Sequence, residues 1–162
     1  MFRRKQPQSQ AGDNPYEGLR AQAIGAVQAG LLAPSRHPKA QGVVINIPSD
    51  GEWIAIVALG DDTTSMYTSV GGGTIGAGEH EIVRDANRQL LGVIEHEVLP
   101  YLDANPGTHP APGFVRYHVL GVDGLAGIDI PEPMFWGSVE GGGNLVDATQ
   151  YLIHTISTVS PG

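Results

Sequence analysis

The stretch Met66–Leu102, MYTSVGGGTIGAGEHEIVRDANRQLLGVIEHEVLPYL, decides the fold, because it joins a strand-like run to the longest helical pattern in the chain. A glycine-rich turn separates the two parts. With a rotation of about 100° per residue from Ile82 on, apolar side chains share one face and most charged ones the other. The apolar face comprises Ile82, Val83, Ala86, Leu90, Val93, Ile94, Val98 and Tyr101. We therefore expect a helix that packs on a sheet and that kinks or ends at Pro100.

The segments on either side of this helix predict further strands and helices. Apolar, β-branched runs bounded by turn residues predict five strands, at Gly42–Ile47, Trp53–Leu59, Ser65–Val70, Phe114–Leu120 and Leu125–Ile130. Helical patterns occur at residues 14–31 and at Leu145–Val159, whereas Pro131–Gly137 is predicted to be irregular. This order predicts a single α+β domain over residues 14–160, a five-stranded antiparallel sheet with helices on both faces. Residues 1–13 are predicted to be a disordered tail.

Composition and charge restrict the class of protein. The chain has 162 residues, of which 41% are hydrophobic and 16% charged, as in globular proteins. Its net charge is −8, and it is −11 (−8 − 3) without the tail residues Arg3, Arg4 and Lys5. Such an acidic body predicts no nucleic acid and no membrane as partners. The chain lacks cysteine and has no apolar run typical of a signal peptide or spanning helix, so we expect a cytoplasmic location.

The glycine-rich turn carries the main chemical suggestion. Gly71, Gly73 and Gly76 fit the dinucleotide pattern G-x-G-x-x-G between a strand and a helix. A dinucleotide fold also needs a parallel strand with a ribose-binding acid about 20 residues later, which an antiparallel sheet does not offer. Two interpretations stay open: the glycines permit close packing, or the turn binds a small ligand or anion. The candidate binding residues are Gly72, Gly73, Gly76, Glu79, His80 and Arg84.

Two Glu-His-Glu triplets, at residues 79–81 and 95–97, raise the question of a metal site. Their histidines are 16 residues apart, about 24 Å along one helix, so we predict no shared metal and no other cofactor. Glu97 is a separate case, because helical spacing places it on the apolar face. We expect it to pair with Arg116 or Tyr117, or to act as a buried acid.

Residues 71–84, GGGTIGAGEHEIVR, resemble a strand–glycine–helix motif, GGGxIGxGEHxxVR, in a family of uncharacterised bacterial proteins. The resemblance covers most of residues 14–158 and implies a bacterial, cytoplasmic protein, but it brings no assigned activity or catalytic residue. The order of elements, α-βββ-α-ββ-α, is similar to the profilin-like and roadblock-like folds, which usually bind partners or dimerise.

Two functional hypotheses follow, and the sequence does not decide whether the protein is an enzyme. The first, which we favour, is a non-enzymatic interaction or dimerisation module, a homo-oligomer or a binder of another protein. It would present a sheet edge or an apolar patch at Met134, Phe135 and Trp136. The second is a small-ligand or anion-binding protein, or an enzyme, that uses the turn from Gly71 to Arg84. It predicts that Gly73→Val removes the ligand and preserves the fold.

Overall fold

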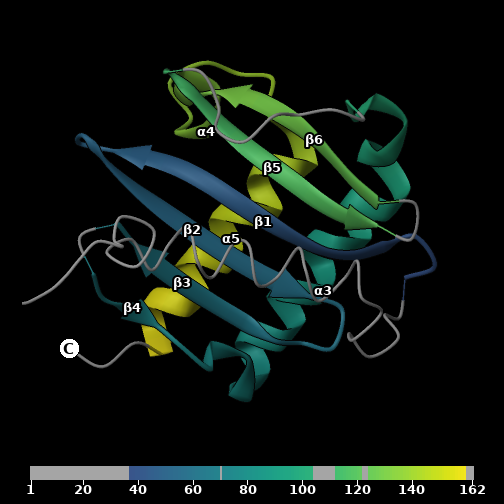
Figure 1. Ribbon diagram of the computed structural model, residues 1–162, viewed down its shortest axis with the longest axis vertical. Coiled ribbons are helices and arrows are strands. Elements are labelled where there is room, and N and C mark those ends of the chain that lie inside the picture. The colour runs from purple at the N-terminus through teal and green to yellow at the C-terminus, as the bar shows by residue number, and fades with distance from the viewer. Residues whose placement is uncertain (1–36, 70, 104–111, 122–123, 160–162) are drawn as a thin grey trace, which may run out of the picture.

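The centre of the structure is a six-stranded antiparallel sheet with the strand order β4-β3-β2-β1-β5-β6 (Figure 1). The structure is a computed structural model and describes residues 37–69, 71–103, 112–121 and 124–159. Its strands are β1 Ala40–Ser49, β2 Glu52–Leu59, β3 Thr64–Thr68, β4 Gly73–Thr74, β5 Phe114–Gly121 and β6 Gly124–Pro131. The predicted α+β class and antiparallel sheet are confirmed, and the sixth strand is β4, inside the glycine-rich turn.

Two long helices cover one face of this sheet. α3 spans Glu81–Val93 and α5 spans Gly143–Val159, and both lie behind the sheet in the view of Figure 1. Since side chains alternate along a strand, every second residue of β1 points into this layer. These residues are Val43, Ile45 and Ile47, which are at most 1% exposed and belong to the main core. The predicted tail and the predicted helix at residues 14–31 lie outside the described residues.

The opposite face of the central strands is buried as well. Val44, Val57, Leu59 and Leu120 form a second apolar cluster. Asn46 and His118 occupy the same face by the alternation along β1 and β5, and both are fully buried. β2 is therefore covered on both faces, as its nearly uninterrupted apolar sequence predicts.

α3 continues into two turns of different geometry. A π-helical segment, η3, spans Ile94–Val98, and a 3-10 turn, η4, spans Leu99–Tyr101. A π-turn takes in one residue more than an α-turn, so the side chains rotate away from the positions that regular helical spacing predicts. Glu97 is therefore exposed and accepts hydrogen bonds from Asn144 Nδ2 at 3.0 and 3.2 Å. The prediction of a buried Glu97 paired with Arg116 or Tyr117 is wrong.

The segment after β6 also differs from its prediction as irregular chain. Glu132–Phe135 forms a short helix, α4, with Pro133 in its first turn. Pro is tolerated there because the N–H that it lacks has no partner within a helix. In the described ranges, no helix combines the length and the apolar character needed to cross a membrane.

Candidate functional site

A pocket of about 320 Å³ lies beside the glycine-rich turn. One wall is the β2–β3 turn, residues 61–64, and the other consists of Gly76, Gly78, Glu79 and Arg84. The 3-10 turn η2 (Ala77–Glu79) and the start of α3 position this second wall. The walls approach closely because Gly78 has no side chain, and a Cβ there would clash with the main-chain oxygen of Asp62.

Three of the six predicted binding residues, Gly76, Glu79 and Arg84, line this pocket. Arg84 Nη1 donates to the main-chain oxygens of Gly78 at 3.1 Å and of Glu79 at 2.8 Å, so the guanidinium closes the turn. The turn that forms the opposite wall is held to α3 by Arg88. Arg88 binds Asp62 through two parallel hydrogen bonds of 3.0 and 2.7 Å, which raise the pKa of Arg88.

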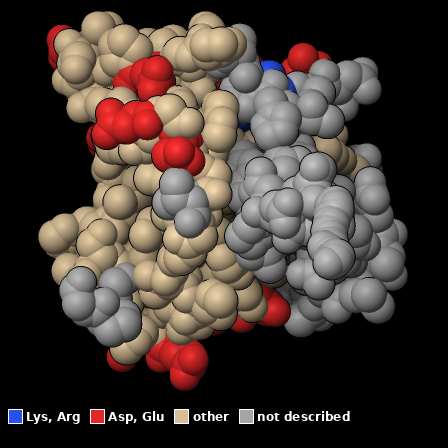
Figure 2. Space-filling model, turned by 60° about the vertical axis from the view of Figure 1, so that its left-hand side comes forward, with Lys and Arg blue, Asp and Glu red and all other residues tan. Residues whose placement is uncertain are grey.

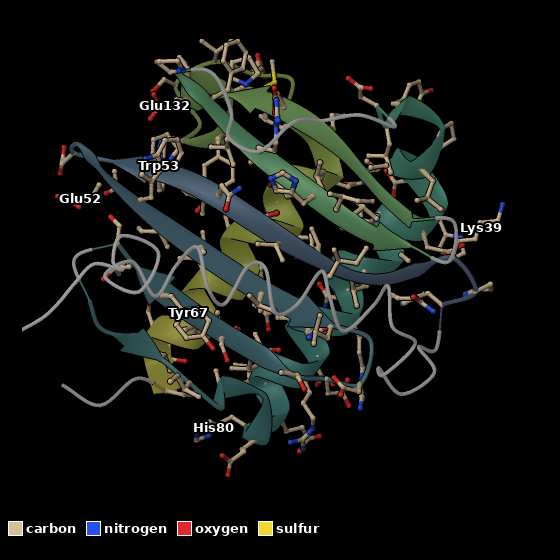
Figure 3. The ribbon with its side chains drawn as sticks, in the orientation of Figure 1. Lys39, Glu52, Trp53, Tyr67, His80 and Glu132 are labelled. Atoms are coloured by element: carbon tan, nitrogen blue, oxygen red, sulfur yellow. The ribbon has the colours of Figure 1, made fainter. Side chains whose placement is uncertain are left out.

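The other three predicted residues, Gly72, Gly73 and His80, do not line the pocket. Gly72 belongs to the turn after β3, where its oxygen accepts the N–H of Thr68 at 3.1 Å. Gly73 pairs with Tyr67 in the sheet at a φ of 145°, and a Cβ there would clash with a main-chain oxygen of β3. His80 is exposed where α3 begins (Figure 3). For Gly73 the geometry favours the packing interpretation, so Gly73→Val would disrupt β4 and could not separate loss of a ligand from loss of the fold.

Carboxylates dominate the rim of this pocket. Asp61, Asp62 and Glu79 contribute three negative charges and Arg84 one positive charge, and Arg88 offsets the charge of Asp62 from outside the lining, so one negative charge remains in excess. The balance disfavours an anion and favours a neutral or cationic ligand. Among the residues that the structure describes, no group of three or more His, Cys, Asp or Glu side chains could hold a metal ion.

A second polar cluster, which sequence reasoning missed, crosses β5 and β6. Arg116 donates from Nε and Nη2 to the two carboxylate oxygens of Asp129, at 2.6 and 2.8 Å. These hydrogen bonds are the main reason why the pKa of Arg116 is raised. The hairpin register that pairs Gly121 with Gly124 also sets Arg116 opposite Asp129. Arg116 and Asp129 are equally far from the predicted hairpin turn, and counting from that turn would have paired them from the sequence alone.

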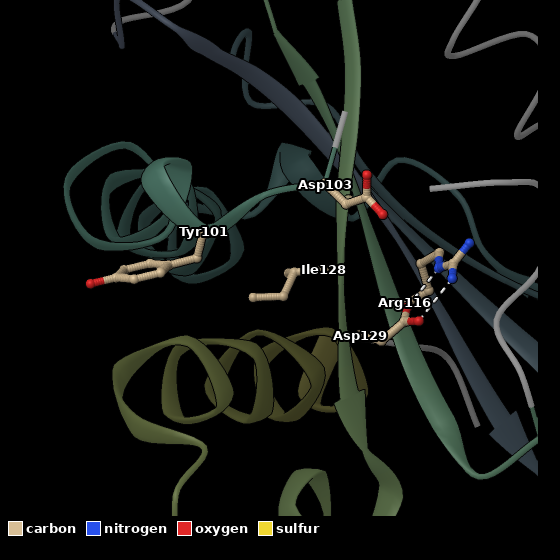
Figure 4. Close-up of a pocket in the computed structure, with 6 residues that line it drawn as sticks. Tyr101, Asp103, Arg116, Ile128 and Asp129 are labelled. Carbon is tan, nitrogen blue, oxygen red and sulfur yellow. Dashed lines mark hydrogen bonds and ion pairs between the residues drawn. The ribbon is translucent and has the colours of Figure 1, made fainter. Parts of the chain in front are cut away.

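A cavity of about 190 Å³ lies beside this ion pair at the edge of β6 (Figure 4). Tyr101, Asp103 and Ile128 complete its lining together with Arg116, Gly127 and Asp129. In Figure 4, Ile128 lies on the helix side of β6 and the ion pair lies on the other side. The residues that line the cavity therefore come from both sides of β6.

A third feature is the turn at residues 132–139, which we call the α4 platform. The predicted patch is only partly correct, because Phe135 is 1% exposed and belongs to the core. Met134 is half-buried. The exposed apolar side chains are Trp136, at 51%, and Val139, at 54%.

Hydrogen bonds fix the backbone under these side chains. The N–H groups of Ser138 and Val139 both donate to the Pro133 oxygen, at 2.8 and 3.1 Å. Gln150 Nε2 of α5 donates to the Phe135 oxygen at 2.8 Å. The Trp136 ring meets the Phe135 ring edge-on, with centroids 5.0 Å apart. The platform is thus tied to both the core and α5.

Comparison with known proteins finds no matching family model, no matching curated protein and no matching solved structure. The resemblance of residues 71–84 to a bacterial family stays a prediction.

Proposed function

We propose that the protein is a non-enzymatic interaction module that binds a protein partner through the α4 platform. The observation that carries the proposal is that Trp136 remains half exposed although the turn beneath it is fixed. A tryptophan held in place loses little conformational freedom on binding. Tryptophan is also among the residues that most often dominate the binding free energy of protein interfaces.

The edges of the sheet support the platform as the more favourable surface. At the β6 edge, Gly127 exchanges two hydrogen bonds with Asp103, at 2.7 and 2.8 Å. Pro131, four residues further along the same strand, has no N–H to offer. At the other edge, β4 has only two residues, Gly73 and Thr74. An added strand would therefore find few free main-chain groups.

Charge selects the kind of partner. Glu132 is the first residue of the platform and Glu140 directly follows it in sequence, and the chain has a net charge of −8. In the left half of the face shown in Figure 2, Asp and Glu side chains gather at the top and bottom, with an uncharged surface between them. A second copy of the chain would bring like charges together at the platform. We therefore favour a partner whose apolar surface is rimmed by Lys and Arg over the homodimer.

Isothermal titration with a short amphipathic peptide of Leu and Lys tests this proposal, with a Leu/Glu peptide as the matched control. We expect saturable binding of the basic peptide, which weakens as salt is added, and no binding of the acidic one. Trp136→Ala should weaken binding at least tenfold, whereas Tyr151→Ala, which removes an exposed aromatic ring from α5, should not. Equal binding by the wild type and Trp136→Ala, or no binding at all, would refute the proposal.

A small-ligand function is the second candidate, because the structure gathers Gly76, Glu79 and Arg84 around one pocket. The carboxylates on its rim favour a cationic ligand. Native mass spectrometry should then show a small adduct on the 17.0 kDa chain. Glu79→Gln should remove this adduct, and an adduct that persists in Glu79→Gln would place the ligand elsewhere.

A further inference from the structure

The second face of the sheet is buried, although none of the described helices contributes to its apolar cluster. The main cluster includes residues of α3, α4 and α5, and both α3 and α5 lie behind the sheet in Figure 1. The second cluster consists of strand residues alone: Val44, Val57, Leu59 and Leu120, with Tyr67 and Leu125 packed beside them. Val44 and Asn46 have 0% of their surface exposed, and Leu120 has 1%. An antiparallel sheet can leave one face in water, so burial this complete requires a covering segment.

The length of chain outside the described ranges points to residues 1–36 as the source of this segment. The other such stretches are residue 70 and residues 104–111, 122–123 and 160–162. The longest of these, 104–111, connects Asp103, which is bridged to β6, with the start of β5, so both of its ends are fixed at one side of the sheet.

A helix has the right length to cover the second cluster. The cluster extends over neighbouring strands from β3 to β6, a width of about 19 Å at about 4.8 Å from strand to strand. A helix of residues 14–31 would be about 27 Å long. It could therefore cross all of these strands, which a helix of eight residues, about 12 Å long, could not.

The sequence of residues 14–31 suits an apolar face. With a rotation of about 100° per residue, five apolar side chains share one side of the predicted helix. They are Leu19, Ala23, Ile24, Val27 and Leu31. Arg20 falls on the same side near the start of the helix, where its long side chain can carry the charge past the apolar contact into water. Ala26 and Gly30, beside the stripe, are small enough to let the helix approach the sheet closely.

The start of β1 fixes the point at which this segment enters the sheet. Glu95 Oε1 accepts the N–H groups of Lys39 and Ala40, at 2.9 and 2.8 Å. β1 lies between β2 and β5 and contributes Val44 to the second cluster. Residues 32–39, between the predicted helix and β1, can span up to about 26 Å. This length allows the helix to fold back over the middle of the sheet.

We propose that residues 14–31 form a helix that packs on the second face of the sheet. The sheet then lies between this helix on one side and α3 and α5 on the other. The occupant of the face is a segment of the same chain, so the apolar side chains of the face are not offered to another protein. The proposal is independent of the α4 platform, because Phe135 of the platform belongs to the main core on the opposite face.

Methyl NOE spectroscopy on the full chain tests this arrangement without any substitution. We expect contacts from the methyl groups of residues 19, 27 and 31 to methyl groups of the second cluster, in Val44, Val57, Leu59 or Leu120. Val43 and Ile45 are the internal control, because they point into the layer of α3 and α5 and should show no such contact. A sample mixed from two differently labelled batches separates contacts within one chain from contacts between two copies.

Two variants form a matched pair, since each replaces an alanine of the predicted helix by aspartate. Position 23 lies in the apolar stripe, and position 21 lies about 160° away around the helix. Ala23→Asp should lower the midpoint of urea unfolding and shift the methyl signals of the second cluster, because it brings an unpaired charge onto a buried face. Ala21→Asp should retain the midpoint and the methyl signals of the wild type.

Three outcomes would overturn the inference. NOE contacts only between differently labelled copies would show that a second copy covers the face. The absence of any contact between residues 14–31 and the second cluster would assign the cover to another segment or to a partner protein. Equal effects of Ala23→Asp and Ala21→Asp would contradict packing through the predicted stripe. If Ala23→Asp does not fold, the NOE contacts of the wild type decide alone.

Discussion

Asn87 gives the sharpest prediction about how α3 is held to the β2–β3 turn. The residue lies on the buried face of α3 and is 1% exposed. Its Nδ2 donates to Thr64 Oγ1 at 2.8 Å and to the main-chain oxygens of Leu59 and Thr63, both at 3.2 Å. Asn87→Ala removes all of these contacts between α3 and the β2–β3 turn.

The expected cost follows from the hydrogen bonds. Two N–H groups serve three acceptors, and each neutral hydrogen bond contributes about 0.5–1.5 kcal/mol net, so their loss costs about 1–3 kcal/mol. Both main-chain acceptors keep another donor, because Asp62 N–H donates to the Leu59 oxygen and Leu59 N–H to the Thr63 oxygen. In the described structure Asn87 Oδ1 is buried without a partner, and its removal offsets part of the loss. We expect Asn87→Ala to lower the free energy of unfolding by about 2 kcal/mol.

Urea unfolding followed by tryptophan fluorescence measures this change, as a lower midpoint with an unchanged m-value. Asn144→Ala is the matched control, since Asn144 is exposed and bonds only to the exposed Glu97 among the described residues. We expect it to change the free energy of unfolding by less than about 0.5 kcal/mol. A change of that small size for Asn87→Ala, or an equal loss for both variants, would refute the reasoning.

Four further predictions concern stability. Gly92→Ala should raise the free energy of urea unfolding by about 0.5–1 kcal/mol, because Gly92 lies inside α3, where alanine is the better helix former. Its Cβ would make an ordinary contact, 3.5 Å from the His37 ring, and a lowered free energy of unfolding would contradict the prediction. Gly78→Ala should lower the midpoint of urea unfolding, because its Cβ would clash with the main-chain oxygen of Asp62. An unchanged midpoint would contradict the close packing. Burial acts to raise the pKa of Glu95, but hydrogen bonds from the N–H groups of Ala40 and Lys39 and the charges of His37 and His96 outweigh it and lower that pKa. A lowered pKa in the folded state stabilises the fold at pH values above the pKa of the unfolded chain, near 4.5, and this stabilisation is lost as the pH falls below that value. Glu95→Gln should therefore make the free energy of unfolding fall less steeply as the pH is lowered. The same pH dependence in the variant and the wild type would contradict a lowered pKa of Glu95. Tyr117→Phe should cost about 1 kcal/mol in urea unfolding, because it removes the buried 2.7 Å hydrogen bond to Thr149 Oγ1; a loss within experimental error of zero would contradict a net contribution from this bond.

Much of the fold could be predicted from the sequence. Strands β1, β2, β5 and β6 match their predicted ranges closely, because their apolar residues are bounded by glycine and proline turns. The last helix begins two residues before its predicted start and ends at Val159, as predicted. These elements follow local rules of side-chain period and turn chemistry.

The predictions that were wrong or missing concern features that regular local patterns do not determine. The π-helical segment at Ile94–Val98 changes the angle by which successive side chains turn around the helix axis, so Glu97 does not lie on the face that regular α-helical spacing predicts. Asn87 is buried because the β2–β3 turn offers it acceptors, and no pattern in its own helix shows that.

The candidate site was predictable only in part. Gly76, Glu79 and Arg84 do line one pocket, but its opposite wall comes from the β2–β3 turn, some 15 residues earlier in the chain. Arg116 and Asp129 could have been paired by counting from their predicted hairpin turn, whereas the pairing of β1 with β5 joins strands far apart in the chain and could not be read from the sequence. The exposure of Trp136 was predicted from the sequence, but Phe135 beside it is buried because it packs into the hydrophobic core, which the local sequence does not show.

The most direct test of the proposed function uses the fluorescence of Trp136 itself. The chain has two tryptophans, so a Trp53→Phe protein reports on Trp136 alone. Titration with the amphipathic Leu/Lys peptide should shift its emission to shorter wavelength and protect it from a soluble quencher, because the partner removes the ring from water. Binding of the peptide with no change in emission or quenching would show that the partner sits elsewhere and would contradict the α4 platform as the binding surface.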